Sequence, residues 1–207
     1  EEYTYKVKDY ADQIIENKDE EDTFRKAAPM VKAMLNYGAY SQIYFGNNEG
    51  NLANAGVEDN VCTANIDTSQ VETFVSPKED IGVRYYASSL ILKSETSIRH
   101  YFTYDSDSLS LEDIKANYEF RFADSVVMPE IKGGYIIIQK DNIEAANLDT
   151  AYQVVVTNKQ TGESIEFNYS ALQYAKSVLE GTGYKEALVN VVKALWLYNE
   201  AANEYYE

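Results

Sequence analysis

The sequence predicts an α+β fold, because helical patterns lie at both ends of the chain and strand patterns lie between them. Residues 1–46 and 169–206 space their apolar side chains at the 3.6-residue period of a helix. Residues 81–168 instead contain short runs of aromatic and β-branched residues, which are typical of antiparallel strands. We therefore expect one module over residues 1–207, with a sheet or sandwich of about six strands packed with N-terminal and C-terminal helices.

The first helical region follows a short extended opening, Tyr3 to Val7, and has its clearest period over Val31 to Phe45. Pro29 lacks a backbone donor, so it fits the first turn of that helix better than the interior of a helix that begins at Asp22. We expect a break near Ala28. The polar, asparagine-rich stretch that follows, residues 46–70, predicts a long ordered loop.

The strand region begins with a hairpin of Gly82 to Leu92 and Ser97 to Tyr104. If Ser94 and Glu95 form its turn, Ile91 opposes Ile98 and Ser89 opposes His100. The further predicted strands are Tyr118 to Phe122, Gly134 to Gln139, Ala151 to Val156 and Ser164 to Asn168.

The C-terminal region predicts two helices separated by Gly181. Ser170 and Gln173 have the spacing of a capping box at the start of the first. The second shares a Val-Lys-Ala sequence and a tyrosine, at identical spacing, with the N-terminal helix, so the two helices are candidates for a packed pair. Its expected buried residues are Leu188, Val191, Val192, Leu195, Tyr198, Ala202 and Tyr205.

Composition narrows the classes of function. The formal net charge is −16. This charge repels phosphate backbones and anionic lipid headgroups, so we expect that the protein neither binds nucleic acid nor inserts into a membrane. Cys62 is the single cysteine, which excludes an intramolecular disulfide and a thiolate metal cluster. No apolar run approaches the roughly 20 residues of a membrane span. Because the chain opens without methionine, we expect a processed product or a piece excised from a larger protein.

The residues indicate no catalytic site, metal site or cofactor. His100 is the single histidine, and by strand alternation it shares a face with Ile98 and Phe102, which favours a packed histidine over a catalytic base. The stretch from Asp105 to Ser108 is rich in oxygen ligands but lacks the pattern of a calcium loop. Whether either has a functional role stays open at this point.

The best candidate for ligand binding is the other face of the hairpin, where Tyr86, Arg99 and Tyr101 are expected to cluster. Tyrosine with arginine is a combination that suits sugar stacking and protein recognition. The competing interpretation is that a helix covers this face and that Arg99 pairs with a carboxylate.

A hydrolase is the alternative function. Glycoside hydrolysis needs two facing carboxylates, and Glu112, Asp113 and Glu130 are the acids that can be nominated, although their segments are equally typical of exposed turns. A third possibility is a purely structural half of a larger domain, which would expose an apolar patch near Tyr3 to Tyr10.

Three blocks, at residues 31–46, 85–102 and 192–205, carry a family resemblance. They begin V-K-A-M-L-N-Y, Y-Y-A-S-S-L-I and V-K-A-L-W-L-Y. In this order they resemble a C-terminal module of large secreted surface proteins of gut Gram-positive anaerobes. The resemblance implies export, attachment to the bacterial cell surface and a multidomain parent, and it implies no enzymatic activity. We therefore expect a non-enzymatic extracellular module for adhesion, binding or spacing, whose partners are neighbouring domains of the parent and a glycan or host protein.

Overall fold

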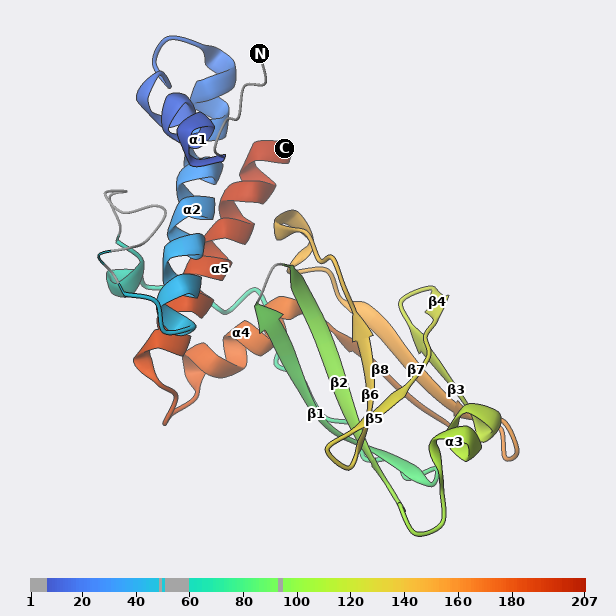
Figure 1. Ribbon diagram of the computed structural model, residues 1–207. Coiled ribbons are helices and arrows are strands. Elements are labelled where there is room, and N and C mark those ends of the chain that lie inside the picture. The colour runs from blue at the N-terminus through green and yellow to red at the C-terminus, as the bar shows by residue number, and fades with distance from the viewer. Residues whose placement is uncertain (1–6, 49, 51–59, 93–94) are drawn as a thin grey trace, which may run out of the picture. The chain divides into compact units, whose positions relative to one another are not determined.

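The computed structural model describes residues 7–48, 50, 60–92 and 95–207 and confirms the α+β fold class (Figure 1). The chain divides into two compact units. One is the helical unit, Glu1–Gln70 with Ala175–Glu207, and the other is the β unit, Val71–Tyr174. The prediction of a single module over the whole chain stays a prediction.

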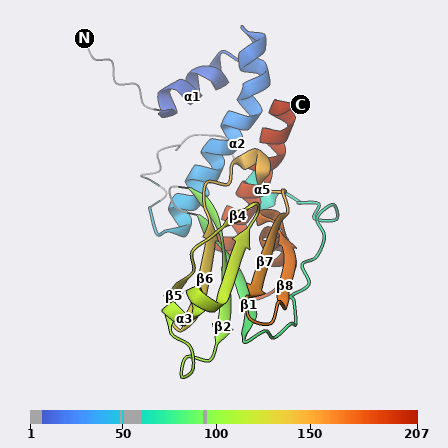
Figure 2. The same cartoon turned by 90° about the vertical axis from the view of Figure 1, so that its right-hand side faces the viewer.

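The helical unit contains a pair of long helices, α2 (Asp22–Tyr44) and α5 (Glu186–Tyr206), that pack side by side (Figure 2). The rings of Tyr37 and Tyr198 stack between them with centroids 6.1 Å apart. These are the tyrosines at matching positions of the repeated Val-Lys-Ala sequence, so the expected helix pair is confirmed. A shorter helix, α1 (Val7–Glu16), packs on α2. The buried cluster there consists of Ala11, Ile14, Ala27, Ala28, Val31 and Leu35.

Pro29 does not break this helix, so the expected break near Ala28 is wrong. The helix runs through Pro29 from Asp22, although a proline in a helix interior costs about 3 kcal/mol. Ala28 and Val31, on either side of it, are buried in the cluster with α1. Burial of this apolar face outweighs the local preference of the proline, which the sequence pattern alone does not reveal.

The cap predicted for the next helix, α4 (Ala171–Glu180), is confirmed. The Ser170 N–H donates to Gln173 Oε1 at 3.0 Å, and the Gln173 N–H donates to Ser170 Oγ at 3.1 Å. Both interactions satisfy backbone donors that a helix start leaves open. The helix ends directly before Gly181, as expected.

The buried side of α5 is only partly as predicted. Because α5 contacts both α2 and the short 3₁₀ helix η2 (Val61–Thr63), more than one stripe of it is covered. The prediction is right at Val191, Val192, Leu195 and Ala202. It is wrong at Leu188, Tyr198 and Tyr205, which are half-buried, and it missed Ala194, Trp196 and Asn199, which are buried.

Of the predicted asparagine-rich loop, residues 46–48, 50 and 60–70 are described, whereas residues 49 and 51–59 lie outside the described residues. Lys193 Nζ donates to the carbonyl oxygens of Cys62 at 3.1 Å and Ala64 at 2.9 Å. Lys176 Nζ donates to the carbonyl of Thr68 at 3.1 Å. Two lysines of the C-terminal helices thus hold residues 60–70 in place.

The β unit consists of two four-stranded antiparallel sheets. Sheet A has the order β1 (Val83–Leu92), β2 (Thr96–Tyr104), β6 (Tyr135–Lys140) and β5 (Glu130–Lys132). Sheet B has the order β4 (Ser125–Val126), β3 (Tyr118–Phe122), β7 (Tyr152–Asn158) and β8 (Ser164–Tyr169). The short helices α3 (Leu111–Asn117) and η3 (Ala145–Asn147) interrupt the strand region. The six predicted strands are present, and the two short strands β4 and β5 were missed.

The predicted register of the first hairpin is wrong by one residue. Ser88 opposes His100, and Leu92 opposes Thr96, so three residues rather than two separate the strands. A bulge then places one extra residue, Tyr86, on β1 between two successive pairs with β2. Loop length and bulge set the register jointly, and neither has a strong signature in this sequence.

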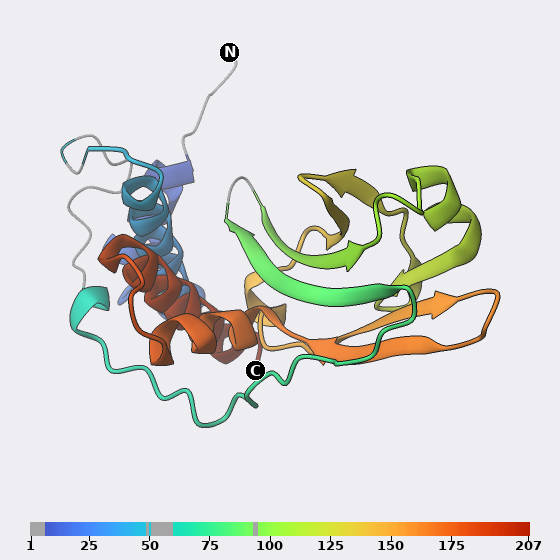
Figure 3. The same cartoon turned by 90° about the horizontal axis from the view of Figure 1, so that it is seen from below.

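The two sheets face each other as the layers of a sandwich (Figure 3), and the space between them is filled largely by aromatic rings. Phe102 of sheet A packs against Phe120 of sheet B with centroids 6.0 Å apart, and both are almost completely buried. His100 packs on Phe122 at 4.8 Å and on Phe167 at 5.1 Å. The inner face of sheet A is therefore a dry aromatic core.

Candidate functional site

The candidate site lies on the outer face of sheet A and follows from strand alternation. Because β2 sends His100 into the sandwich, its neighbours Arg99 and Tyr101 lie on the opposite side. The pairing of β2 with β6 sets Gln139 beside Arg99 and Ile137 beside Tyr101. The outer face of sheet A, as we use the term, consists of Tyr86, Ala87, Ser89, Arg99, Tyr101, Glu130, Lys132, Tyr135, Ile137 and Gln139.

Three tyrosines form one half of this face. Tyr86 stacks on Tyr135 with ring centroids 4.7 Å apart, and Tyr101 meets Tyr135 edge-on at 6.1 Å. The bulge leaves Tyr86 58% exposed, so the cluster is open to solvent. The pKa of Tyr135 is raised, mainly because its hydroxyl is hydrogen-bonded with Tyr86 and to a smaller extent because of burial. The cluster offers aromatic surface with hydroxyl groups beside it.

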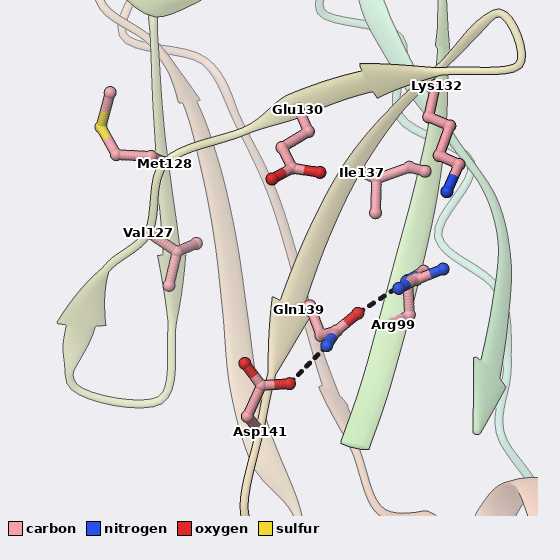
Figure 4. Close-up of a pocket in the computed structure, with 8 residues that line it drawn as sticks. All are labelled: Arg99, Val127, Met128, Glu130, Lys132, Ile137, Gln139 and Asp141. Carbon is pink, nitrogen blue, oxygen red and sulfur yellow. Dashed lines mark hydrogen bonds between the residues drawn. The ribbon is translucent and has the colours of Figure 1, made fainter. Parts of the chain in front are cut away.

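A polar pocket of about 430 Å³ forms the other half (Figure 4). Within it, Arg99 Nε donates to Gln139 Oε1 at 2.7 Å, and Gln139 Nε2 donates to Asp141 Oδ1. Its volume lies within the roughly 300–1,000 Å³ typical of small-molecule sites. The lining residues are Arg99, Val127, Met128, Glu130, Lys132, Ile137, Gln139 and Asp141.

Charge is separated across this pocket. Figure 4 shows the cationic ends of Arg99 and Lys132 on one side and the carboxylates of Glu130 and Asp141 on the other, with Gln139 between them. Hydrogen-bond donors thus lie opposite acceptors. A ligand that offers both kinds of group to its surroundings would find partners on both sides.

The sequence predicted part of this arrangement. Tyr86, Arg99 and Tyr101 do share the outer face, and the partner of Arg99 is the neutral Gln139 rather than the carboxylate that the competing interpretation requires. Tyr135 and Gln139 were missed, together with Lys132 and Asp141. The alternation that places Tyr135 and Gln139 on one side of β6 was visible in the sequence. The pairing of β6 with β2 joins residues about 40 positions apart and has no local signal.

His100 lies in the sandwich core and not in the pocket. Its Nδ1 is 2.6 Å from Ser88 Oγ, which in turn is 2.7 Å from the Tyr85 hydroxyl. No group among the described residues lies within hydrogen-bonding distance of its Nε2. Burial lowers the pKa of His100 to about 3, so the imidazole is neutral near pH 7. The histidine is packed in the core as predicted, although of its two ring nitrogens only Nδ1 has a hydrogen-bond partner among the described residues.

The nominated acids lie in two separate places, α3 and the pocket. Glu112 and Asp113 are in the first turn of α3, a helix that the sequence analysis missed, rather than in a turn. Asp113 forms a capping box with Ser110, and these hydrogen bonds lower its pKa. Glu130, by contrast, lines the pocket.

The stretch from Asp105 to Ser108 is a self-contained turn. The carboxylate of Asp105 accepts from Ser108 Oγ at 2.7 Å and from the Asp107 N–H at 3.1 Å, and these bonds lower its pKa. No set of three or more metal-ligating side chains occurs among residues 7–48, 50, 60–92 and 95–207. Cys62 is exposed.

Two further sequence features concern the helices. Val7 is 75% exposed and Tyr10 57%, whereas the remainder of the expected apolar patch, residues 3–6, lies outside the described residues. Within the described part of the chain, none of the helices combines the length and apolar character needed to cross a membrane.

No protein-family model matches the chain, and no curated protein or solved structure is detectably similar to it. The resemblance to surface proteins of gut anaerobes therefore stays a prediction.

Proposed function

We propose that this protein is a non-enzymatic recognition module that binds a saccharide on the outer face of sheet A. The observation that carries the proposal is the pocket of about 430 Å³ beside an open cluster of three tyrosines. The cluster supplies a surface for the apolar face of a sugar ring, and the pocket supplies fixed donors and acceptors for its polar groups.

Preorganisation supports this proposal. Gln139 holds the Arg99 side chain by one hydrogen bond and is itself held by Asp141. Tyr101 is likewise placed by Tyr135 and by Ser89 Oγ, which is 3.3 Å from its hydroxyl. Side chains that are already ordered lose less conformational entropy when a ligand binds. They also lie on strands, which are more rigid supports than loops.

The cellular setting is part of the same proposal. The family resemblance supports export to the bacterial cell surface as one module of a larger protein, with neighbouring domains as partners. The net charge of −16 disfavours nucleic acid and anionic membrane surfaces. A glycan is favoured over a host protein as ligand, because the tyrosines and pocket form a compact polar site rather than a broad apolar patch.

A glycan array with the 207-residue chain, followed by titration calorimetry on any hit, tests the proposal. Tyr101→Ala removes a ring from the tyrosine cluster and should weaken binding about fivefold or more, since ring stacking contributes on the order of 1 kcal/mol or more. Arg121→Ala is the matched control, because Arg121 lies on the outer face of sheet B. Binding that survives Tyr101→Ala, or the lack of any saccharide hit, would contradict the proposal.

The hydrolase alternative rests on the same pocket, because Glu130 and Asp141 both line it. A glycosidase would use one of two carboxylates as acid and the other as base or nucleophile. Incubation with each bound saccharide distinguishes the two functions by the appearance of new reducing ends. If these appear and Glu130→Gln abolishes them, the protein is an enzyme and the non-enzymatic proposal fails.

A further inference from the structure

Arg99 differs from the other arginines of the described chain. The guanidinium groups of Arg25, Arg84 and Arg121 each lie at ion-pairing distance from a carboxylate. Arg99 instead donates its Nε to the neutral amide of Gln139, and it has no carboxylate within ion-pairing distance among the described residues. In a chain with thirty-four acidic side chains, an arginine without an acidic partner is conspicuous.

The amide of Gln139 fixes how Arg99 is presented. Its nitrogen donates to Asp141, which leaves its oxygen to accept from Arg99 Nε. One edge of the guanidinium is therefore occupied, and the two terminal amino groups retain their donors for the pocket. Terminal amino groups of this kind pair with carboxylates through two parallel hydrogen bonds.

Lys132 adds a second cation on the same side of the pocket (Figure 4). Like Arg99, it forms no ion pair with a described residue. Glu130 and Asp141 lie on the other side, where they can accept hydrogen bonds from hydroxyl groups. The pocket thus has one side suited to an anion and one suited to hydroxyl donors.

We propose that the ligand is an acidic saccharide, whose carboxylate binds Arg99 and Lys132 while its hydroxyl groups face Glu130 and its ring lies toward the tyrosine cluster. This inference rests on the proposed saccharide binding and names the class of sugar. Gln139 is a positioning residue here, because it acts through Arg99.

The substitution that tests the positioning role of Gln139 is Gln139→Glu. It keeps the size of the side chain, removes the amide donor to Asp141 and gives Arg99 the carboxylate partner that it lacks, so the guanidinium is neutralised before the ligand arrives. It also adds a negative charge that repels an acidic ligand. The matched control is Gln153→Glu, which changes the net charge equally on an exposed, outward position of β7 in sheet B.

The experiment compares each acidic saccharide on the array, uronic acid and sialic acid oligosaccharides included, with its methyl ester, which differs only in charge. We expect esterification, Arg99→Ala and Gln139→Glu each to weaken binding at least about tenfold, and Gln153→Glu to change it less than about twofold. The affinity should also fall as salt is raised. Circular dichroism melts of the variants confirm that each remains folded.

The outcomes distinguish the two proposals. Equal binding of acids and esters, or binding of neutral saccharides alone, would overturn the acidic ligand while saccharide recognition stands. Binding of no saccharide would contradict both proposals. Binding of an acidic peptide in the same pocket would mean that the ligand is a carboxylate other than a saccharide. Equal loss of binding by Gln139→Glu and Gln153→Glu would show a general charge effect and reject the role of Gln139.

Discussion

The two faces of sheet A use similar residue types for opposite purposes. On the inner face, His100 and Phe102 have no exposed surface, and the rings of sheet B cover them. On the outer face, their neighbours Arg99 and Tyr101 are half-buried beside a pocket. Aromatic and polar residues at adjacent positions of one strand can therefore serve stability on one side and recognition on the other, depending on what covers them.

The largest effect on stability is expected when an aromatic ring of the inner face is removed. Phe102→Ala leaves a cavity between the sheets and should lower the free energy of unfolding by about 3–5 kcal/mol, measured by urea denaturation. A loss below about 1 kcal/mol would mean that the sandwich core is not packed as described.

Acid should destabilise the inner face through His100. The imidazole has an ordinary pKa of 6.5 in the unfolded chain and a pKa of about 3 when folded. Between these values the unfolded state binds the extra proton, so stability is full above about pH 6.5 and falls as the pH is lowered through this window. By pH ~4.5 the loss from His100 should reach about 3 kcal/mol.

Urea melts at neutral pH and near pH 4.5 measure this loss. His100→Phe retains an aromatic ring without the titratable group. It should reduce the loss of stability between these two pH values by about that amount. A slope that His100→Phe leaves unchanged would show that other groups carry the acid dependence.

Ser88 and Ser89 are neighbours on β1 that lie on opposite faces of sheet A. Ser88→Ala removes the hydroxyl that joins Tyr85 to His100 Nδ1 and should cost about 1–3 kcal/mol, because a buried ring nitrogen then lacks a partner. Ser89→Ala, on the outer face, should cost less than about 0.5 kcal/mol. Equal losses of stability for the two variants in thermal melts would contradict the difference between a buried inner face and an open outer face.

A similarly small effect on stability is expected for Tyr101→Ala. Its ring meets Tyr135 on the open side of the sheet, so its loss should change the free energy of unfolding by less than about 1 kcal/mol. Denaturant melts beside binding titrations test whether binding and stability separate at this position. A loss comparable to that of Phe102→Ala would show that the outer face belongs to the core.

How much could be predicted depends on the range of the interactions. The capping box of Ser170 and Gln173 was predictable, because both partners lie within one turn. The alternation that divides Arg99 and Tyr101 from His100 and Phe102 was predictable for the same reason. The candidate site was predicted only in part. Gln139, Asp141 and Lys132 line the same pocket as Arg99 because of strand pairings that no local pattern predicts.

The α+β class, the six longer strands and the side of β2 on which each residue lies could all be predicted from local patterns, because they follow from periods of 3.6 and 2 along the chain. Three features depend on tertiary packing: α2 continues through Pro29, the hairpin shifts by one residue and bulges at Tyr86, and β5 and β6 complete a pocket around Arg99. Each of these depends on burial or pairing between distant segments, whose free energies exceed the local preferences of the residues involved.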